Sequence, residues 1–92
     1  MIVSFKCPYT KALAEGQRVI RFQSVERTAL RKMRQLQIAE FLDDLKVPPG
    51  NRLQRLKGDR SGQYSIRIND QYSICFRWTD AGAEDVEIAD YH

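Results

Sequence analysis

The sequence is poor in the residues that build disulfide scaffolds and metal sites. Its 92 residues include two cysteines, Cys7 and Cys75, and one histidine, and the cysteines lie far apart in the chain. A zinc site needs several such ligands at short, characteristic spacings. We therefore expect two reduced, part-buried thiols, no metal site and no cofactor.

The chain also lacks a long hydrophobic run. No apolar stretch approaches the roughly 20 residues of a membrane-spanning helix, and the opening residues, MIVSFK, lack the pattern of a secretory signal peptide. We therefore expect a cytoplasmic protein with no membrane partner. With 42% hydrophobic and 29% charged residues, we expect residues 1–92 to form a single folded domain.

Charge is unevenly distributed along the chain, whose formal net charge is +3. Residues 51–67 hold five basic residues and one acidic residue, and residues 24–37 hold four and one. Residues 80–90 hold five acidic residues and no basic residue. A molecule polarised in this way attracts a polyanion to one face. We interpret residues 51–67 as the anion-binding segment and residues 24–37 as the solvated face of a helix.

The first half of the chain has helical patterns. Pro8 can open a short helix that Gly16 would end. Ser24 is a suitable N-cap for a longer helix, whose apolar stripe is Val25, Ala29, Met33 and Leu36. A second stripe, consisting of Ile38, Phe41, Leu42 and Leu45, either continues a bent helix or forms another one. The run Pro48-Pro49-Gly50 stops the helical pattern.

The second half alternates with the period of β-strands. Apolar positions recur at every second residue in 64–68 and 72–78, with an Asn69-Asp70 turn between them, and Val86 and Ile88 indicate a last strand. The sequence therefore predicts an α+β fold, with N-terminal helices packed on a small three- to four-stranded antiparallel sheet. The polar positions, among them Arg67, Ser73, Cys75 and Arg77, predict a basic, open sheet face that suits RNA.

Several short motifs in this half resemble a known family. The run PPGNRLQRLKGDRSGQYSIRINDQYSICFRW, followed by VEIADYH at the end, resembles the HigB-like branch of RelE-type toxins, and LKGDR, SIRIND, CFRW and DYH are its specific parts. The resemblance covers nearly the whole chain. It implies a RelE-like fold, docking in the ribosomal A site and cleavage of mRNA there. It also implies a helix-turn-helix antitoxin of the HigA type, through which alone the protein would meet operator DNA.

The resemblance also indicates where the chemistry would lie. Metal-independent RNA cleavage needs a base for the ribose 2′-OH, cations for the phosphate and an acid for the leaving 5′-oxygen. The DYH match assigns His92 to proton transfer or substrate orientation, Tyr91 to base stacking or proton transfer, and Asp90 to orienting His92. Lys57 is the expected phosphate clamp. Further contacts to RNA or the ribosome are expected from Arg67 and, more weakly, from Arg52, Arg55, Arg60 and Arg77.

Two positions depart from the family pattern. Gln54 stands where related toxins have histidine or an acidic residue, and an amide cannot transfer a proton at ordinary pH. Ser73 stands where an arginine usually follows the aromatic residue of this strand. Losing one charge-assisted contact in the transition state costs about 3 kcal/mol, or roughly 100-fold in rate. We therefore hypothesise an attenuated or inactive nuclease.

Two other functions stay open at this point. The wider fold family includes toxins that inhibit DNA gyrase without cutting RNA, and Ser73 is compatible with that activity. A plain RNA-binding module would use the basic sheet face, with an affinity that falls steeply with salt. The sequence also leaves open whether an antitoxin covers the basic face or packs on the helices.

Overall fold

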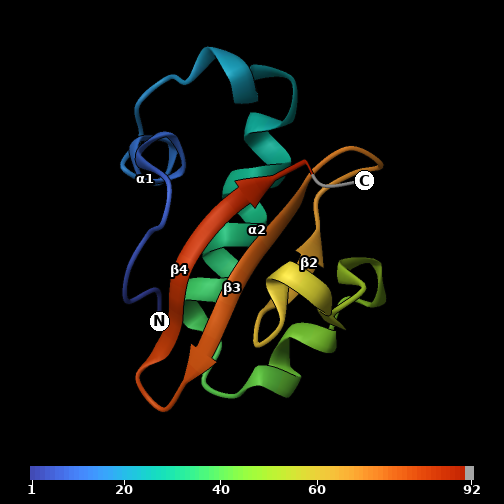
Figure 1. Cartoon of the computed structure of the whole chain (residues 1–92). Coiled ribbons are helices and arrows are strands. Elements are labelled where there is room, and N and C mark those ends of the chain that lie inside the picture. Colours follow the sequence, from blue (N-terminus) through green and yellow to red (C-terminus); the bar gives the residue numbers. More distant parts are fainter. Residues whose placement is uncertain (91–92) are drawn as a thin grey trace.

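A four-stranded antiparallel sheet forms one layer of the structure and helices on one of its faces form the other (Figure 1). In the computed structural model, which describes residues 1–90, the helices are α1 (Pro8–Ala14) and α2 (Glu26–Ile38). The strands are adjacent in chain order: β1 (Gln54–Arg55), β2 (Tyr64–Arg67), β3 (Ser73–Thr79) and β4 (Gly82–Ala89). The predicted α+β fold is confirmed.

Short 3₁₀ turns connect these elements. They are η1 (Ile20–Val25), η2 (Leu42–Lys46), η3 (Pro49–Asn51) and η4 (Gly58–Arg60). The N-terminal residues 2–6 make two isolated parallel bridges to β4, from Ile2 to Ala83 and from Phe5 to Val86. These bridges cover the outer edge of β4. Within residues 1–90, no helix is long and apolar enough to cross a membrane.

The alternation in the strands separates a core face from an outer face. Ile66, Ile74 and Phe76 are completely buried in the core cluster with residues of α2. Ile74 lies opposite Ile66 on one side and Ile88 on the other, so the apolar residues form a continuous row across three strands. The polar positions between them point to the outer face. The predicted faces of β2 and β3 are therefore confirmed.

The helix α2 packs on this core face through Ala29, Met33 and Leu36, as predicted. Its start differs from the prediction, because α2 begins at Glu26 after η1 and Ser24 does not cap it. Val25 occupies the cap position without a side-chain hydrogen bond, and it is buried together with Phe22. The packing of η1 therefore fixes the beginning of the helix.

The second apolar stripe was predicted to continue a bent helix or to form another one, and this is confirmed only in part. Ile38 and Phe41 are each 67% exposed, and the helix ends at Ile38. The backbone N–H groups of Glu40 and Phe41 both donate to Asp44 Oδ2, at 3.0 Å. This carboxylate stabilises the turn into η2, so the chain leaves the helical path before Phe41 can pack.

Lys32 was predicted to lie on the solvated face of α2, but it is buried. Its ammonium donates to Asn51 Oδ1, and Asn51 is itself completely buried. Asn51 Nδ2 donates to Gln35 Oε1 at 2.8 Å and to Leu45 O at 3.1 Å. Burial, helped by the neighbouring Arg31, lowers the pKa of Lys32. This Asn51 network joins α2 to η2 and η3, the segment that leads into β1.

Replacing Asn51 with alanine should therefore destabilise the fold strongly. The change removes the partner of a buried ammonium group and of a buried carbonyl, and each orphaned group costs about 1–3 kcal/mol. We expect a loss of roughly 2–4 kcal/mol in the free energy of unfolding, measured by urea denaturation. Asn69→Ala is the matched control, because Asn69 makes its hydrogen bonds in an exposed turn. Equal losses in the two variants would contradict the role given to the Asn51 network.

Candidate functional site

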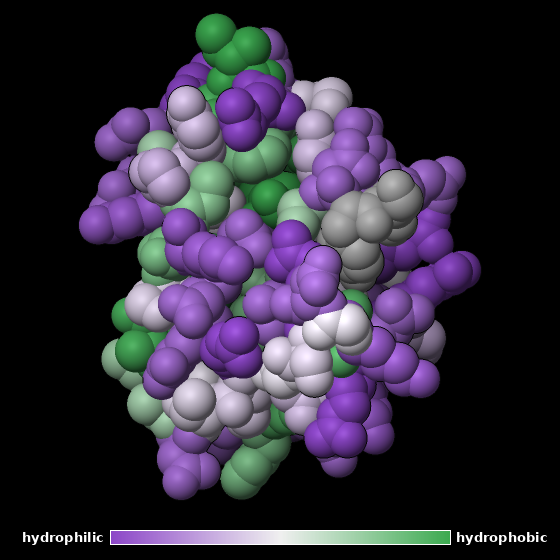
Figure 2. Space-filling view, in the orientation of Figure 1, coloured by the Kyte–Doolittle hydropathy of each residue, from purple (hydrophilic) through white to green (hydrophobic). Residues whose placement is uncertain are grey.

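The outer face of the sheet has a hollow of about 380 Å³ at one end. Its lining comes from β1, β2, the start of β3 and the β2–β3 turn: Arg52, Gln54, Ser65, Arg67, Asn69, Asp70 and Ser73. Four of these residues were predicted from the sequence, namely Arg52, Gln54, Arg67 and Ser73. We call this feature the sheet hollow. The surface in which it lies is mainly hydrophilic (Figure 2).

Strand register brings the side chains of the sheet hollow together. Gln54 lies opposite Ser65, and Arg67 lies opposite Ser73. Ser65 and Arg67 are two residues apart in β2, so both point to the outer face. Arg52 reaches the rim from a left-handed backbone conformation, with φ +47°, directly after the buried Asn51. The Asn51 network therefore also anchors this corner of the sheet hollow.

The C-terminal segment leaves the sheet next to the sheet hollow. Ala89, the last residue of β4, lies opposite Ser73 in the register. The next residue, Asp90, is exposed and accepts a hydrogen bond at its Oδ2 from Gln71 Nε2, at 3.1 Å. The β2–β3 turn thus holds Asp90 beside Ser73. The predicted residues Tyr91 and His92 follow Asp90 and lie outside the described residues.

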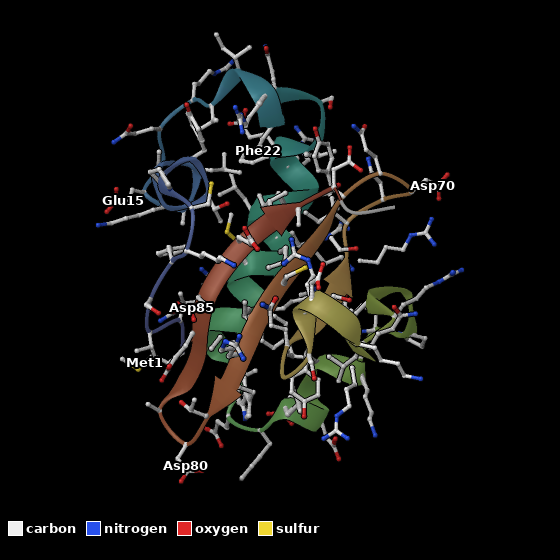
Figure 3. The ribbon with its side chains drawn as sticks, viewed as in Figure 1. Met1, Glu15, Phe22, Asp70, Asp80 and Asp85 are labelled. Carbon is white, nitrogen blue, oxygen red and sulfur yellow. The ribbon has the colours of Figure 1, made fainter. Side chains whose placement is uncertain are left out.

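Arg67 is the arginine of the sheet hollow that carries an ion pair. Its Nη2 contacts Asp70 Oδ1 in the β2–β3 turn, where the side chain of Asp70 is 96% exposed. Figure 3 shows Asp70 at the tip of this turn. An ion pair with so exposed a partner is weak in water. Arg67 can therefore exchange its carboxylate partner for a phosphate at small cost.

Lys57 and Arg55 lie outside the lining of the sheet hollow. Both side chains are exposed on the segment from β1 to η4, and Lys57 is the residue directly before η4. Within residues 1–90, Lys57 has no ion pair. The Arg55 guanidinium lies 5.9 Å from the centre of the Tyr64 ring. The structure thus leaves the Lys57 ammonium exposed toward solvent.

Arg60 is tied into the fold, in contrast to Lys57. Its Nη1 lies 2.7 Å from Glu87 Oε1 on β4 and 3.2 Å from Gln63 Oε1. These bonds fasten η4 over the outer face, and Figure 1 shows it beside β3 on the side of β2. The outer face was predicted to be open, and this was wrong at its middle, because Cys75 is completely buried there.

Burial also decides the chemistry of Cys75. Desolvation raises the pKa of this thiol to about 11, although the nearby Arg60 acts in the opposite direction. At neutral pH Cys75 therefore stays protonated, and a protonated thiol is a poor nucleophile. Cys75 is part of the packing under η4 and is more deeply buried than the expected part-buried thiol, whereas Cys7 is partly buried as expected.

Arg77 lies at the far end of the outer face. Four residues of β3 separate it from Ser73, which is about 13 Å along a strand. Its Nε lies 3.5 Å from Asp85 Oδ2 on β4. Figure 3 shows Asp85 far from Asp70, which lies in the β2–β3 turn. Arg77 therefore does not belong to the sheet hollow.

Sequence reasoning missed part of the lining. Asn69 and Asp70 were recognised only as a turn, and Ser65 only as an outward-facing residue. Asn69 Oδ1 accepts hydrogen bonds from the backbone N–H groups of Gln71 and Tyr72, at 2.9 and 2.7 Å. The Asn-Asp turn signal could have indicated that these side chains stay near Arg67 and Ser73. The role of Gln71 at Asp90 left no local signal, because the two residues are far apart in sequence.

These residues suit the binding of an anion beside polar hydrogen-bonding groups. Two guanidinium groups can hold a phosphate, and the amide and hydroxyl groups can orient a sugar or a base. The volume lies at the lower end of the range of about 300–1,000 Å³ for ligand sites.

Comparison with known proteins shows which proteins the chain resembles. Residues 5–92 match the family model described as the RelE-like toxin of type II toxin–antitoxin system HigB. The toxin HigB-1 of Vibrio cholerae serotype O1 is 36% identical over 85 residues, which cover 90% of each chain. An uncharacterised protein of Haemophilus influenzae is 38% identical over 48 residues, or 52% of this chain and 48% of that one.

Solved structures share the fold. The YoeB–YefM complex from Staphylococcus aureus matches with a TM-score of 0.57 and 18% identity, covering 100% of this chain and 98% of that one. The YoeB/ParE toxin from Agrobacterium tumefaciens matches with a TM-score of 0.56 and 18% identity, covering 99% and 98%. The family model and the relative from Vibrio cholerae show more than the fold. The chain therefore belongs to the HigB branch of the RelE-like toxins of type II toxin–antitoxin systems.

Proposed function

We propose that this toxin is a ribosome-dependent endoribonuclease that cleaves mRNA in the A site, with the sheet hollow as its phosphate site. The observation that carries the proposal is the convergence of Arg52, Gln54, Arg67 and Ser73 in one hollow. The C-terminal segment, which holds the predicted proton-transfer residues, begins beside Ser73. The whole of residues 1–92 would act as one domain, in the cytoplasm, together with a HigA-like antitoxin.

The proposed reaction needs only groups of this chain and of the RNA. A base takes the proton of the ribose 2′-OH, and the 2′-oxygen attacks the adjacent phosphorus. The bond to the 5′-oxygen breaks, and an acid protonates that leaving oxygen. The products are a 2′,3′-cyclic phosphate and a 5′-OH. We assign proton transfer to His92 and Tyr91, with Asp90 as the residue that orients His92.

Cations stabilise the charge that develops on the phosphate. Arg67 and Arg52 line the sheet hollow, and the exposed Lys57 can reach an RNA strand that lies along the same edge. Arg67 would leave Asp70 for the phosphate, because the bidentate arginine–phosphate contact is stronger than an exposed ion pair. Gln54 would donate a hydrogen bond to the substrate, since it cannot transfer a proton.

Ser73 weakens this site. Its side chain lines the sheet hollow opposite Arg67, but it has no charge to give to the phosphate. Position 73 is therefore where the missing family arginine would act. The lack of a charge at Ser73 favours a second candidate function. In that case the protein would bind and inhibit its target, for example DNA gyrase, without cutting RNA.

Lys57→Met should reduce ribosome-dependent cleavage by about 100-fold, because it removes one cationic contact to the transition state. We would add the purified protein to a reconstituted translation reaction and map the mRNA ends by primer extension, with and without ribosomes. Lys46→Met is the matched control, because Lys46 is an exposed lysine that pairs with Asp43. Cuts that persist without ribosomes, or a lack of cuts with every variant, would contradict the proposed function.

Ser73→Arg should raise the cleavage rate by about 100-fold, because the added guanidinium would lie in the sheet hollow near Arg67. Ser73→Met is the control, since methionine fills similar space without a charge. The same primer-extension reactions give the rates. If Arg and Met behave alike, the missing arginine does not limit the reaction.

A further inference from the structure

A second hollow, of about 400 Å³, lies on the helical side of the molecule. It runs between the N-terminal segment, the end of α1 and α2, and we call it the helix groove. Its apolar lining consists of Ile2, Phe5, Ala14, Leu30, Met33 and Ile38. Ile38 is 67% exposed and Leu30 is 36% exposed, so apolar surface of α2 faces solvent along this groove. The groove passes Leu30 into a further hollow that Arg18 and Arg27 line.

Positive charge flanks the helix groove. Arg27, Arg31 and Arg34 are exposed and follow one another at intervals of four and three residues, the spacing of one helix face. Within residues 1–90 none of the three forms an ion pair. Glu15 and Glu26 are the carboxylates that line the groove and its extension. With Arg18, the four arginines outnumber the two glutamates, so the surroundings of the groove are basic.

We infer that the helix groove is the docking surface for an acidic, amphipathic segment of the partner antitoxin. Apolar side chains of that segment would cover Leu30 and Ile38, and its carboxylates would pair with Arg27, Arg31 and Arg34. From Arg27 to Ile38 the groove follows about 17 Å of α2, the length of roughly three helical turns. An amphipathic helix can bind such a groove by laying its apolar face on the apolar strip, and acidic residues at its edge would then meet the arginines. The inference rests on the toxin–antitoxin assignment of this family.

The helix groove lies well away from the sheet hollow. Figure 3 shows Glu15, which lines the helix groove, across the molecule from Asp70, which lines the sheet hollow. A segment bound in the helix groove would therefore not need the basic residues of the sheet hollow. Of the two faces that the sequence leaves open for an antitoxin, the helices are the one assigned here.

Binding of the antitoxin encoded beside this chain tests the assignment. We would measure its dissociation constant by biolayer interferometry for the wild type, for Ile38→Asp and for Arg31→Glu/Arg34→Glu. A charge placed in a buried contact, or a reversed ion pair, should weaken binding by at least about tenfold. Ile20→Asp is the control for the apolar change, because Ile20 is 88% exposed on η1, and Arg52→Glu/Arg55→Glu is the control for the charge reversal.

The two surfaces give opposite patterns. Loss of affinity in the groove variants, with both controls within about threefold of the wild type, would support the inference. Loss confined to Arg52→Glu/Arg55→Glu would place the antitoxin on the sheet side, at the sheet hollow or beside it, and would overturn the inference, as would unchanged affinity in all variants. The assay does not depend on RNA cleavage. Antitoxin binding at the groove by a protein that cuts no mRNA would overturn only the proposed function.

Discussion

The register of three antiparallel strands is the constraint on which the rest of the structure depends. It places Ile66, Ile74 and Ile88 in one row against α2 and leaves Arg67, Ser73 and Ala89 in the next row on the outer face. A shift of one residue would exchange the two faces, because side chains alternate along a strand. The burial of the apolar row therefore fixes the positions of the polar one. The sheet hollow is a consequence of how the core packs, since its residues cannot move without moving that row.

Two sets of polar contacts then shape the outer face. The Asn51 network inside the fold binds Lys32, Gln35 and the backbone of Leu45 together, and so fixes the segment that carries Arg52 and Gln54 to the sheet. The pair of Arg60 and Glu87 fastens η4 over Cys75 and closes the middle of the face. The sheet hollow lies at the end of this face where Ser73 is found, and Arg77 lies at the other end. Basic residues therefore have different roles that the sequence does not distinguish. Lys32 and Arg60 stabilise the fold, whereas Lys57 faces solvent.

In the helical half, too, the sequence pattern predicts the burial of some apolar residues, and tertiary packing decides that of others. The stripe of Ala29, Met33 and Leu36 was correctly predicted to be buried. The apolar face of an amphipathic helix packs against the core, which here is the sheet. Ile38 lies two residues after Leu36 and therefore outside that stripe, and it is 67% exposed at the end of the helix. The exposed apolar surface at Ile38 is a feature of the folded structure. It lies beside three arginines without ion pairs in the described part of the chain, and this combination gives the molecule a second face suited to a partner.

The sequence by itself determined the class of the fold, the core faces of the strands and of α2, and the family, because these follow from short-range periodicity and from motifs that are contiguous in the chain. It also indicated four lining residues of the sheet hollow. Only the tertiary structure decided that Lys32 is buried, that Arg60 is bound to Glu87, that Arg77 lies apart from Arg67 and that Gln71 holds Asp90. These outcomes depend on contacts between residues far apart in sequence, and the free energy of such contacts comes from burial and geometry that no local pattern records.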